Sequence, residues 1–425
     1  MGDRVAALTG QIAQRRPTHA EVDLDAITDN VRQLAAHVAP AALCAVVKAD
    51  GYGHGAVESA RAACRGGAAW LAVALVEEGV QLRQAGVDGP ILVLSEPPPE
   101  AEGDVADHRL TATVYSHAAI DRLAGSAAAA DRCIDLHLKV DTGMHRVGAQ
   151  PSEVLELAAD IARCPQLRHT GTFTHLAVAD APDDPFTATQ LRRFDDVLGS
   201  MRLRGFEPGI VHASNSAGAL AHPAARYDMV RCGIAIYGQD PDVRCRAGEF
   251  GVGLRPAIRL VSAISHVKVL PAGERLSYGQ RYELGTESVV VTVPIGYADG
   301  VPRRLSSVGG EVLIGGRRCP IAGRVTMDQI LVDWGPPPAV GSDQTMPELG
   351  DPVVLLGGQG DASVGAWEWA MRLDTIAYEI TCGISGRVPR RYTERSTDDD
   401  TIATTRPVPA SLQAGVGPPG PEREQ

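Results

Sequence analysis

Residues 43–55 read LCAVVKADGYGHG, in which an apolar run ends in Lys48 and enters a loop with three glycines. The alternation of a short apolar run with a longer amphipathic stretch, such as 152–163 or 186–203, continues to about residue 240. Near-continuous apolar strands that alternate with helices are typical of parallel βαβ units. Eight such strands predict a (β/α)8 barrel of the TIM type, and they are expected at 43–47, 70–75, 91–94, 110–114, 134–140, 169–174, 209–212 and 229–237.

The pattern changes on both sides of this barrel. Residues 20–23 predict a strand that joins the β-rich part, followed by a helix that Asp25 caps and whose apolar face holds Ile27, Val31, Leu34 and Val38. Further strands are expected at 263–270, 288–294, 311–314, 329–333 and 352–356, with a short helix at 365–373. We therefore expect an N-terminal extension (1–19), an α/β barrel (20–245), a mostly β C-terminal domain (246–392) and a disordered tail (393–425).

The composition is that of an ordinary globular protein: of 425 residues, 40 are Lys or Arg and 52 are Asp or Glu, for a net charge of −12. This balance disfavours nucleic-acid and acidic-membrane binders, because both need a basic footprint. No apolar stretch approaches the ~20 residues that span a bilayer, and no signal peptide is apparent, so we expect a cytoplasmic protein. Eight cysteines without a CxxC and 12 histidines without an HExxH predict reduced thiols and no metal site.

Lys48 is the first candidate for chemistry. Side chains at the C-terminal ends of the strands form the active sites of such barrels. A lysine that is partly desolvated there can lose its proton and act as a nucleophile or a base. The alternative is a lysine at the end of a strand whose amine extends into water over a glycine turn.

The expected strand 134–140 alternates, which puts Asp135, His137 and Lys139 on one face and the aliphatic residues on the other. It leads into a loop that carries Arg146 to the barrel mouth. An arginine there can bind a carboxylate through two parallel hydrogen bonds. The alternative is a surface ion pair.

Polar residues also gather at the last three expected strands. Hydroxyl and backbone N–H groups in the last loops of this fold commonly bind phosphate. The residues concerned are His175 after the sixth strand, Asn215 and Ser216 after the seventh, and Arg231, Gly233 and Ile234 in the eighth.

Two compact turns stand out in the β-rich region. The segment VPIGYADG (293–300) contains Tyr297, and VTMDQ (325–329) contains Met327. A free phenol titrates near pH 10, so a tyrosine acts as a base at neutral pH only where cations or hydrogen bonds stabilise the phenolate. The alternative is a packed ring with a satisfied hydroxyl.

Nine motifs between about residues 20 and 392 together resemble the pyridoxal-phosphate-dependent alanine racemases in order and spacing. They are AVVKADGYGHG, LKVDTGMHRVG, THLAVAD, HASNSA, VRCGIAIYG, SYGQRY, VPIGYADG, AGRVTMDQ and TIAYEI. The resemblance implies an isomerase that interconverts L-alanine and D-alanine for peptidoglycan synthesis. It also implies a homodimer whose active sites are shared between the subunits. Thr326 stands where many members of the family carry Cys. The difference is mild, because the role expected of this segment belongs to the backbone at the next residue, Met327.

The resemblance also implies the catalytic residues. Lys48 would hold pyridoxal phosphate as a Schiff base and exchange the Cα proton of the D-enantiomer. Tyr297 of the partner subunit would serve the opposite face, that of the L-enantiomer. Arg231 would face the pyridine nitrogen, and because a guanidinium keeps its proton, the cofactor would be a weaker electron sink. His175 would hydrogen-bond both Tyr297 and Arg231.

Further residues would bind the cofactor and the substrate. The implied cofactor-binding set is Lys48, Tyr52, His175, Asn215, Ser216, Arg231, Gly233, Ile234 and Tyr378. Arg146, Tyr297 and the backbone at Met327 would bind the substrate, with Arg146 also contacting the cofactor's phenolic oxygen. Lys139 matches a lysine that is often carbamylated in the family, which would turn a cation into an anion beside Arg146.

Three other functions are weighed against this one. A racemase of serine or of a broader range of amino acids would share every motif and differ in pocket volume near Tyr297 and Tyr378. A decarboxylase of the same architecture and cofactor would favour a carboxylate at the ring nitrogen, where this sequence has Arg231. A non-catalytic cofactor-binding barrel would lack the β-domain that carries Tyr297.

Overall fold

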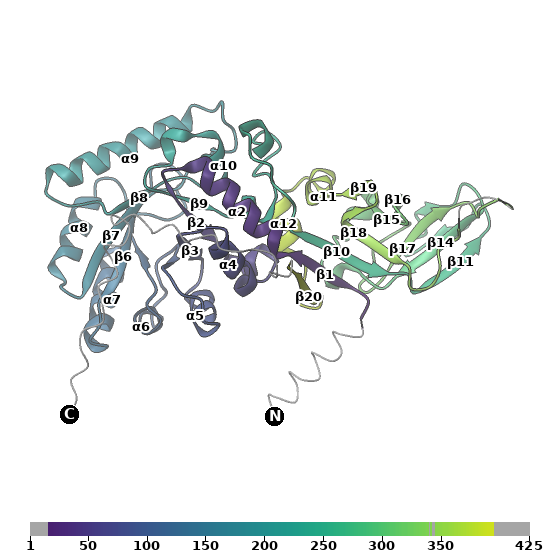
Figure 1. Cartoon of the computed structure of the whole chain (residues 1–425), viewed down its shortest axis with the longest axis horizontal. Coiled ribbons are helices and arrows are strands. Elements are labelled where there is room, and N and C mark those ends of the chain that lie inside the picture. Colours follow the sequence, from purple (N-terminus) through teal and green to yellow (C-terminus); the bar gives the residue numbers. More distant parts are fainter. Residues whose placement is uncertain (1–15, 340, 342–344, 395–425) are drawn as a thin grey trace, which may run out of the picture.

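The computed structural model describes residues 16–339, 341 and 345–394, and it consists of a barrel and an elongated β-domain (Figure 1). The barrel strands form two hydrogen-bonded groups, in the orders β4-β3-β2-β9 and β5-β6-β7-β8. Their bounds are β2 Ala42–Val46, β3 Trp70–Val73, β4 Ile91–Val93, β5 Ala112–Val114, β6 Ile134–Lys139, β7 Leu167–Phe173, β8 Ile210–His212 and β9 Met229–Cys232.

The two groups of strands join into a closed ring. Between β4 and β5, Thr111 donates to Ile91 and accepts from Val93, both at 2.9 Å. Between β8 and β9, the N–H of Arg231 donates to the carbonyl of Ser214 at 3.0 Å. The predicted barrel of eight parallel strands followed by a mostly β domain is therefore confirmed.

Helices alternate with the strands and cover the outside of the barrel (Figure 1). Helix α8 shows why they dock, since Val154, Leu157, Ala158 and Ile161 form one buried face. The bounds are α2 Leu24–Val38, α4 Ala56–Arg65, α5 Val76–Gln84, α6 Glu102–Asp107, α7 His117–Ala129, α8 Val154–Arg163, α9 Phe186–Leu203 and α10 Ser216–Ala221.

Three sequence expectations need correction. The strand expected at 229–237 ends at Cys232, and a 3-10 helix, Ile234–Tyr237, follows it. The strand expected at 263–270 is the end of β10 (Ile258–Ala263) and all of β11 (His266–Leu270), which pair in different sheets. Helix α2 is capped by Asp23, which accepts the N–H of Ala26 at 2.9 Å, and Asp25 lies in its first turn.

The β-domain contains two main sheets. A seven-stranded sheet has the order β16-β15-β18-β10-β1-β20, with β19 paired to β18, and a three-stranded sheet has the order β11-β14-β17. A short hairpin pairs β12 with β13. The bounds are β1 His19–Asp23, β12 Arg275–Leu276, β13 Tyr282–Glu283, β14 Ser288–Val293, β15 Glu311–Ile314, β16 Arg317–Pro320, β17 Ile330–Gly335, β18 Pro352–Gln359, β19 Ala362–Val364 and β20 Arg390–Thr393.

The two ends of the described chain tie the β-domain to the barrel. Strand β1 pairs antiparallel with β10 and parallel with β20, and it leads directly into α2 of the barrel (Figure 1). Two helices, α11 (Ala366–Leu373) and α12 (Ala377–Cys382), precede β20. The tail predicted from residue 393 begins too early, because Thr393 is the last residue of β20 and pairs with Asp23. The rest of that tail, from 395 onward, lies outside the described residues.

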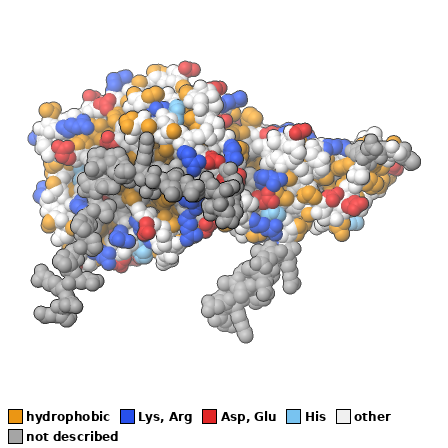
Figure 2. All heavy atoms as spheres, in the orientation of Figure 1, with side chains coloured by type: hydrophobic (Ala, Val, Ile, Leu, Met, Phe, Trp, Pro, Cys, Tyr) orange, Lys and Arg blue, Asp and Glu red, His pale blue; other side chains and the backbone are white. Residues whose placement is uncertain are grey.

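The surface carries mixed charges. Figure 2 shows Lys and Arg side chains interspersed with Asp and Glu over both parts of the described chain. None of the helices that the structure describes has the length and apolar character needed to cross a membrane.

Candidate active site

Lys48 lies at the start of α3 (Lys48–Tyr52), a turn of reversed hand. Ala49, Asp50 and Tyr52 all have φ values between 50° and 53°, in the left-handed region, which costs L-residues about 1–2 kcal/mol each. The backbone N–H of Ala49 donates to the Glu78 carboxylate at 2.7 Å, and the Asp50 carboxylate accepts the N–H of Ala56 at 2.9 Å. These side chains hold the strained turn and fix the direction of Lys48 and Tyr52.

The Lys48 amine is prepared for nucleophilic chemistry. Burial lowers the pKa of Lys48, and the nearby Arg146 guanidinium lowers it further. Its Nζ forms no hydrogen bond within the described part of the chain. A lysine amine with a lowered pKa is neutral more often, and only the neutral amine attacks a carbonyl carbon.

Lys139 is a second buried amine, on β6. Its Nζ donates to the carbonyl of Leu94 at 3.1 Å and lies 5.3 Å from the centre of the Phe173 ring. Burial lowers the pKa of Lys139 to about 7, with further lowering by the cationic Arg231, Arg146 and Lys48. Only 5% of Lys139 is exposed.

Arg146 lies at the exposed mouth of the barrel, in the loop after β6. The Asp141 carboxylate shapes this loop by accepting the N–H groups of Gly143 at 2.9 Å and His145 at 3.0 Å. The charge of Arg146 acts on both Lys48 and Lys139. A free guanidinium beside two such amines can receive a carboxylate.

Arg231 is buried on β9, and its guanidinium donates to protein acceptors. It donates to the carbonyls of Thr174 and Ala213, both at 2.9 Å, to Nδ1 of His212 at 2.7 Å and to Nδ1 of His175 at 3.2 Å. Burial lowers the pKa of Arg231 to about 10, so it stays a cation at neutral pH.

His175 is consequently a neutral donor. Burial and then the charge of Arg231 hold the pKa of His175 well below its usual range. Because a guanidinium can only donate, Nδ1 of His175 accepts and its Nε2 carries the proton. That N–H can donate to a further oxygen, as expected for a partner of a tyrosine phenol.

A third group of residues lies beside α3 and is called the cradle below; it consists of Tyr52, Ser216, Gly233 and Tyr378. A Cβ added to Gly233 would lie 2.3 Å from the Tyr52 hydroxyl oxygen, so only glycine leaves this space open. The N–H of Gly233 donates to the Ser216 hydroxyl at 3.0 Å, and the rings of Tyr52 and Tyr378 are 6.1 Å apart. Ile234 follows at the start of the 3-10 helix. Asn215 contributes indirectly, because its side chain caps α10 by accepting the N–H of Gly218 at 2.9 Å.

Tyr297 and Met327 lie elsewhere in the single chain, in the β-domain. Their turns are joined, since the N–H of Tyr297 donates to the carbonyl of Thr326 at 2.9 Å and that of Ala298 to the carbonyl of Met327 at 3.1 Å. Tyr297 is 41% exposed and Met327 is 52% exposed. Among the described residues, no hydrogen bond, ion pair or ring contact joins either side chain to Lys48.

Three residues near this site have no role predicted from the sequence. Glu78 holds the Lys48 turn from α5, and no motif marks it. His212 belongs to the motif HASNSA, which is a signal that could have found it. Cys382 on α12 lies near Lys48: burial raises the pKa of the Cys382 thiol, and the charge of Lys48 partly offsets this.

Comparison with known proteins assigns a family to this arrangement. Residues 22–241 match the alanine racemase N-terminal domain, and residues 257–392 match the alanine racemase C-terminal domain. The chain is 46% identical to an alanine racemase of Symbiobacterium thermophilum over 377 residues, which covers 89% of this chain and 97% of that protein.

Solved structures agree with the sequence comparison. The alanine racemase from D-cycloserine producing Streptomyces lavendulae has a TM-score of 0.82 at 39% identity, covering 90% of this chain and 98% of that one. The alanine racemase of Bacillus anthracis, solved with bound L-Ala-P, has a TM-score of 0.81 at 37% identity and covers 89% and 95% of the two chains.

Proposed function

This chain belongs to the alanine racemase family and is an isomerase that interconverts L-alanine and D-alanine; we propose that it does so with pyridoxal phosphate and two bases, Lys48 and Tyr297 of the partner subunit. The proposal includes a homodimer in the cytoplasm that supplies D-alanine for peptidoglycan. The observation that carries it is the separation of the two bases: Lys48 lies in the barrel mouth, whereas Tyr297 is exposed on the β-domain, where a second subunit can reach it.

The residues present suit pyridoxal phosphate. Lys48 offers an amine of lowered pKa to the aldehyde, and Arg231 offers a buried cation to the ring nitrogen. Tyr52, Ser216, Gly233, Ile234 and Tyr378 would hold the phosphate, and the open space over Gly233 supports this assignment. When bound, pyridoxal phosphate withdraws electrons from the Cα of the amino acid and so makes loss of the Cα proton possible.

Lys48 and Tyr297 would move that proton. Inversion at a tetrahedral carbon is simplest when one base removes the proton from one face and an acid delivers a proton to the other. We assign Lys48 to the face of D-alanine and Tyr297 to the face of L-alanine. His175, with its Nε2–H free to donate, would orient the Tyr297 oxygen.

Arg231 would hold the ring nitrogen without giving it a proton. The pKa of about 10 leaves the guanidinium protonated throughout the neutral range. Its Nη2 donates to the carbonyls of Thr174 and Ala213 and its Nη1 to His212, so its plane cannot turn freely. The ring nitrogen would therefore remain an acceptor, unlike in enzymes that place a carboxylate there.

Arg146 and the backbone at Met327 of the partner subunit would bind the substrate carboxylate. Lys139, if converted to an anionic carbamate, would hold the Arg146 guanidinium in position. A neutral amine nitrogen attacks the carbon of CO2, forms an N–C bond and releases one proton, which leaves an anionic carbamate. A pKa of about 7 makes the neutral amine abundant at neutral pH, which supports this step.

The two-base assignment is tested with Tyr297→Phe. We expect the purified variant with pyridoxal phosphate to lose racemisation by roughly 10²–10⁴-fold while the cofactor absorbance persists. Tyr227→Phe is the matched control, because it removes a phenol whose hydroxyl donates to Asp195 on the barrel surface. Undiminished racemisation by Tyr297→Phe would refute the assignment.

A further inference from the structure

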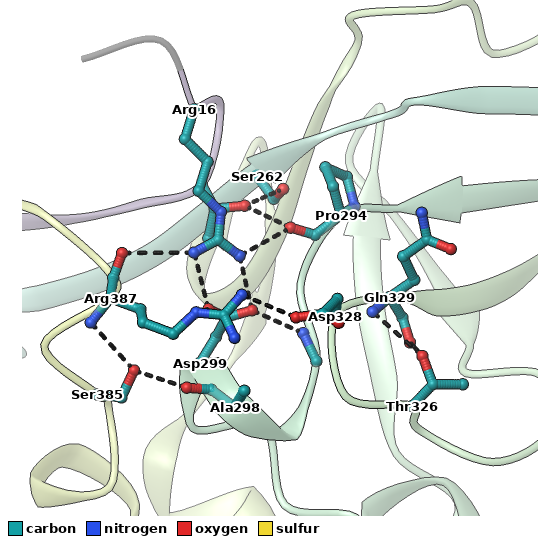
Figure 3. Close-up of polar contacts among 12 residues, drawn as sticks. Arg16, Ser262, Pro294, Ala298, Asp299, Thr326, Asp328, Gln329, Ser385 and Arg387 are labelled. Atoms are coloured by element: carbon teal, nitrogen blue, oxygen red, sulfur yellow. Dashed lines mark hydrogen bonds and ion pairs between the residues drawn. The ribbon is translucent and has the colours of Figure 1, made fainter. Parts of the chain in front are cut away.

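Arg16 and Asp299 form a two-point ion pair (Figure 3), and Asp299 ends the turn that begins at Tyr297. Nη1 of Arg16 lies 2.7 Å from Oδ1 of Asp299, and Nη2 lies 2.7 Å from Oδ2. The Asp299 side chain is 0% exposed and the Arg16 side chain is 22% exposed. A carboxylate buried to this extent needs compensation, and a parallel pair of charge-assisted hydrogen bonds supplies it with defined geometry.

The backbone contacts of this pair lie on both sides of Tyr297 in the sequence. Asp299 ends the 3-10 turn Tyr297–Asp299, and its Oδ2 accepts the N–H of Gly296 at 3.0 Å. Nη2 of Arg16 also donates to the carbonyl of Pro294 at 3.2 Å. One guanidinium and one carboxylate therefore fix the backbone on both sides of Tyr297.

The same network reaches the Met327 turn. A Cβ on Gly296 would lie 2.3 Å from the carbonyl oxygens of both Thr326 and Met327, so the two turns are in direct contact. Arg387 lies 3.3 Å from Oδ1 of Asp299 and donates to Asp328 at 2.8 Å. A shift of Asp299 would therefore displace both segments that are proposed to enter the partner's site.

We propose that Arg16 and Asp299 are positioning residues for racemisation, which set the place of Tyr297 in the partner's active site. Arg16 precedes β1 and lies before residue 22, where the match to the family's N-terminal domain begins. This inference rests on the proposed role of Tyr297. An alternative is that the pair only anchors residues 16–18 to the β-domain. In that case its loss lowers stability without slowing L-alanine exchange more than D-alanine exchange.

The test measures hydrogen exchange at each of the two faces of the substrate Cα separately, in deuterated water. With the full-length dimer and pyridoxal phosphate, solvent exchange of the Cα hydrogen of D-alanine reports on Lys48, and that of L-alanine reports on Tyr297. In Arg16→Met and Asp299→Asn, we expect L-alanine exchange and the kcat of racemisation to fall on the order of tenfold to hundredfold. D-alanine exchange and the cofactor absorbance should stay within about twofold of wild type.

Arg16→Lys keeps the charge but loses the two-point geometry, and we expect it to lose L-alanine exchange to an intermediate extent. If Arg16→Met fails to fold, Arg16→Lys decides the outcome. Arg32→Met is the control, because Arg32 forms an ion pair with Asp29 at the surface, where its side chain is 62% exposed. We expect this variant to leave both exchange rates unchanged.

The outcomes separate this inference from the proposed function. Wild-type L-alanine exchange in folded Arg16→Met, Arg16→Lys and Asp299→Asn would overturn the positioning role, as would equal losses on both faces. Tyr297→Phe is measured alongside them. If it retains L-alanine exchange, the assignment of Tyr297 itself is wrong, whereas selective loss in Tyr297→Phe without loss in the Arg16 variants rejects only the positioning role.

Discussion

Nη1 of Arg231 lies 2.7 Å from Nδ1 of His212 in the interior of the barrel. The guanidinium can only donate, so Nδ1 of His212 accepts and its Nε2 carries the proton. That N–H donates to Nδ1 of His137 at 2.9 Å. Burial holds the pKa of His212 well below its usual range and lowers that of His137 to about 3, so both rings are neutral. The orientation of Arg231 is thus set by a fixed sequence of donors and acceptors.

Replacing this acceptor should weaken the protein. In His212→Leu one N–H of a buried guanidinium loses its partner, and we expect the free energy of unfolding to fall by about 2 kcal/mol. Urea unfolding of the variant measures this change, with His266→Leu, at an exposed position on β11, as the control. A loss no larger than that of the control would contradict the described role of His212.

Lys139 should make stability depend on pH. Its pKa is about 7 in the folded protein and near the ordinary 10.5 in the unfolded chain. Between these values the unfolded chain binds more protons, so the free energy of unfolding contributed by this group rises with pH. Below about 7 both states are protonated, and the cost of burying the charge is present in full. Lys139→Met removes this dependence.

The measurement compares wild type with Lys139→Met by urea unfolding in CO2-free buffer from about pH 6 to pH 9. Wild type should gain stability relative to the variant as the pH rises. A constant difference across this range would show that Lys139 does not titrate near neutrality.

Labelled bicarbonate tests the carbamate directly. We expect one slowly exchanging carbamate signal per subunit by carbon-13 NMR, which is absent from Lys139→Met. The signal should weaken at acid pH, because protonation of the amine removes the nucleophile. A wild-type spectrum identical to that of the variant would argue against a carbamate at Lys139.

Gly233→Ala tests the cradle beside Tyr52. The added methyl would lie 2.3 Å from the Tyr52 oxygen, and we expect the Kd for pyridoxal phosphate to rise by about tenfold or more. Gly199→Ala on α9 is the control, since its Cβ would meet no atom within 4 Å. Fluorescence titration of the apoprotein gives both constants, and equal affinities would exclude Gly233 from the phosphate site.

Much of the fold could be predicted because buried parallel strands are apolar throughout and helices repeat between them. The errors occur where local pattern and tertiary pairing diverge. Residues 263–270 look like one strand, yet the chain passes from one sheet to another after Ala263. The left-handed turn at Ala49 was not predictable, because Glu78, 29 residues away, helps to hold it.

The candidate site could be predicted through motifs, and the structure brings the barrel residues together. Arg231, Arg146 and Lys48 are close enough to Lys139 to lower its pKa, and Arg146 also lowers the pKa of Lys48. The contacts that hold the Tyr297 turn could not be predicted, because the Arg16–Asp299 pair joins residues 283 positions apart. No pattern within a single stretch of sequence reports such a contact.

The two-base proposal requires that each active site take Lys48 from one subunit and Tyr297 from the other. Lys48→Ala and Tyr297→Phe should each be inactive as homodimers. When the two are unfolded, mixed in equal amounts and refolded with pyridoxal phosphate, each heterodimer regains one intact site, so racemisation should return to about a quarter of the wild-type level. If both bases came from the same chain, every site in the mixture would lack one of them, and the mixture would remain inactive.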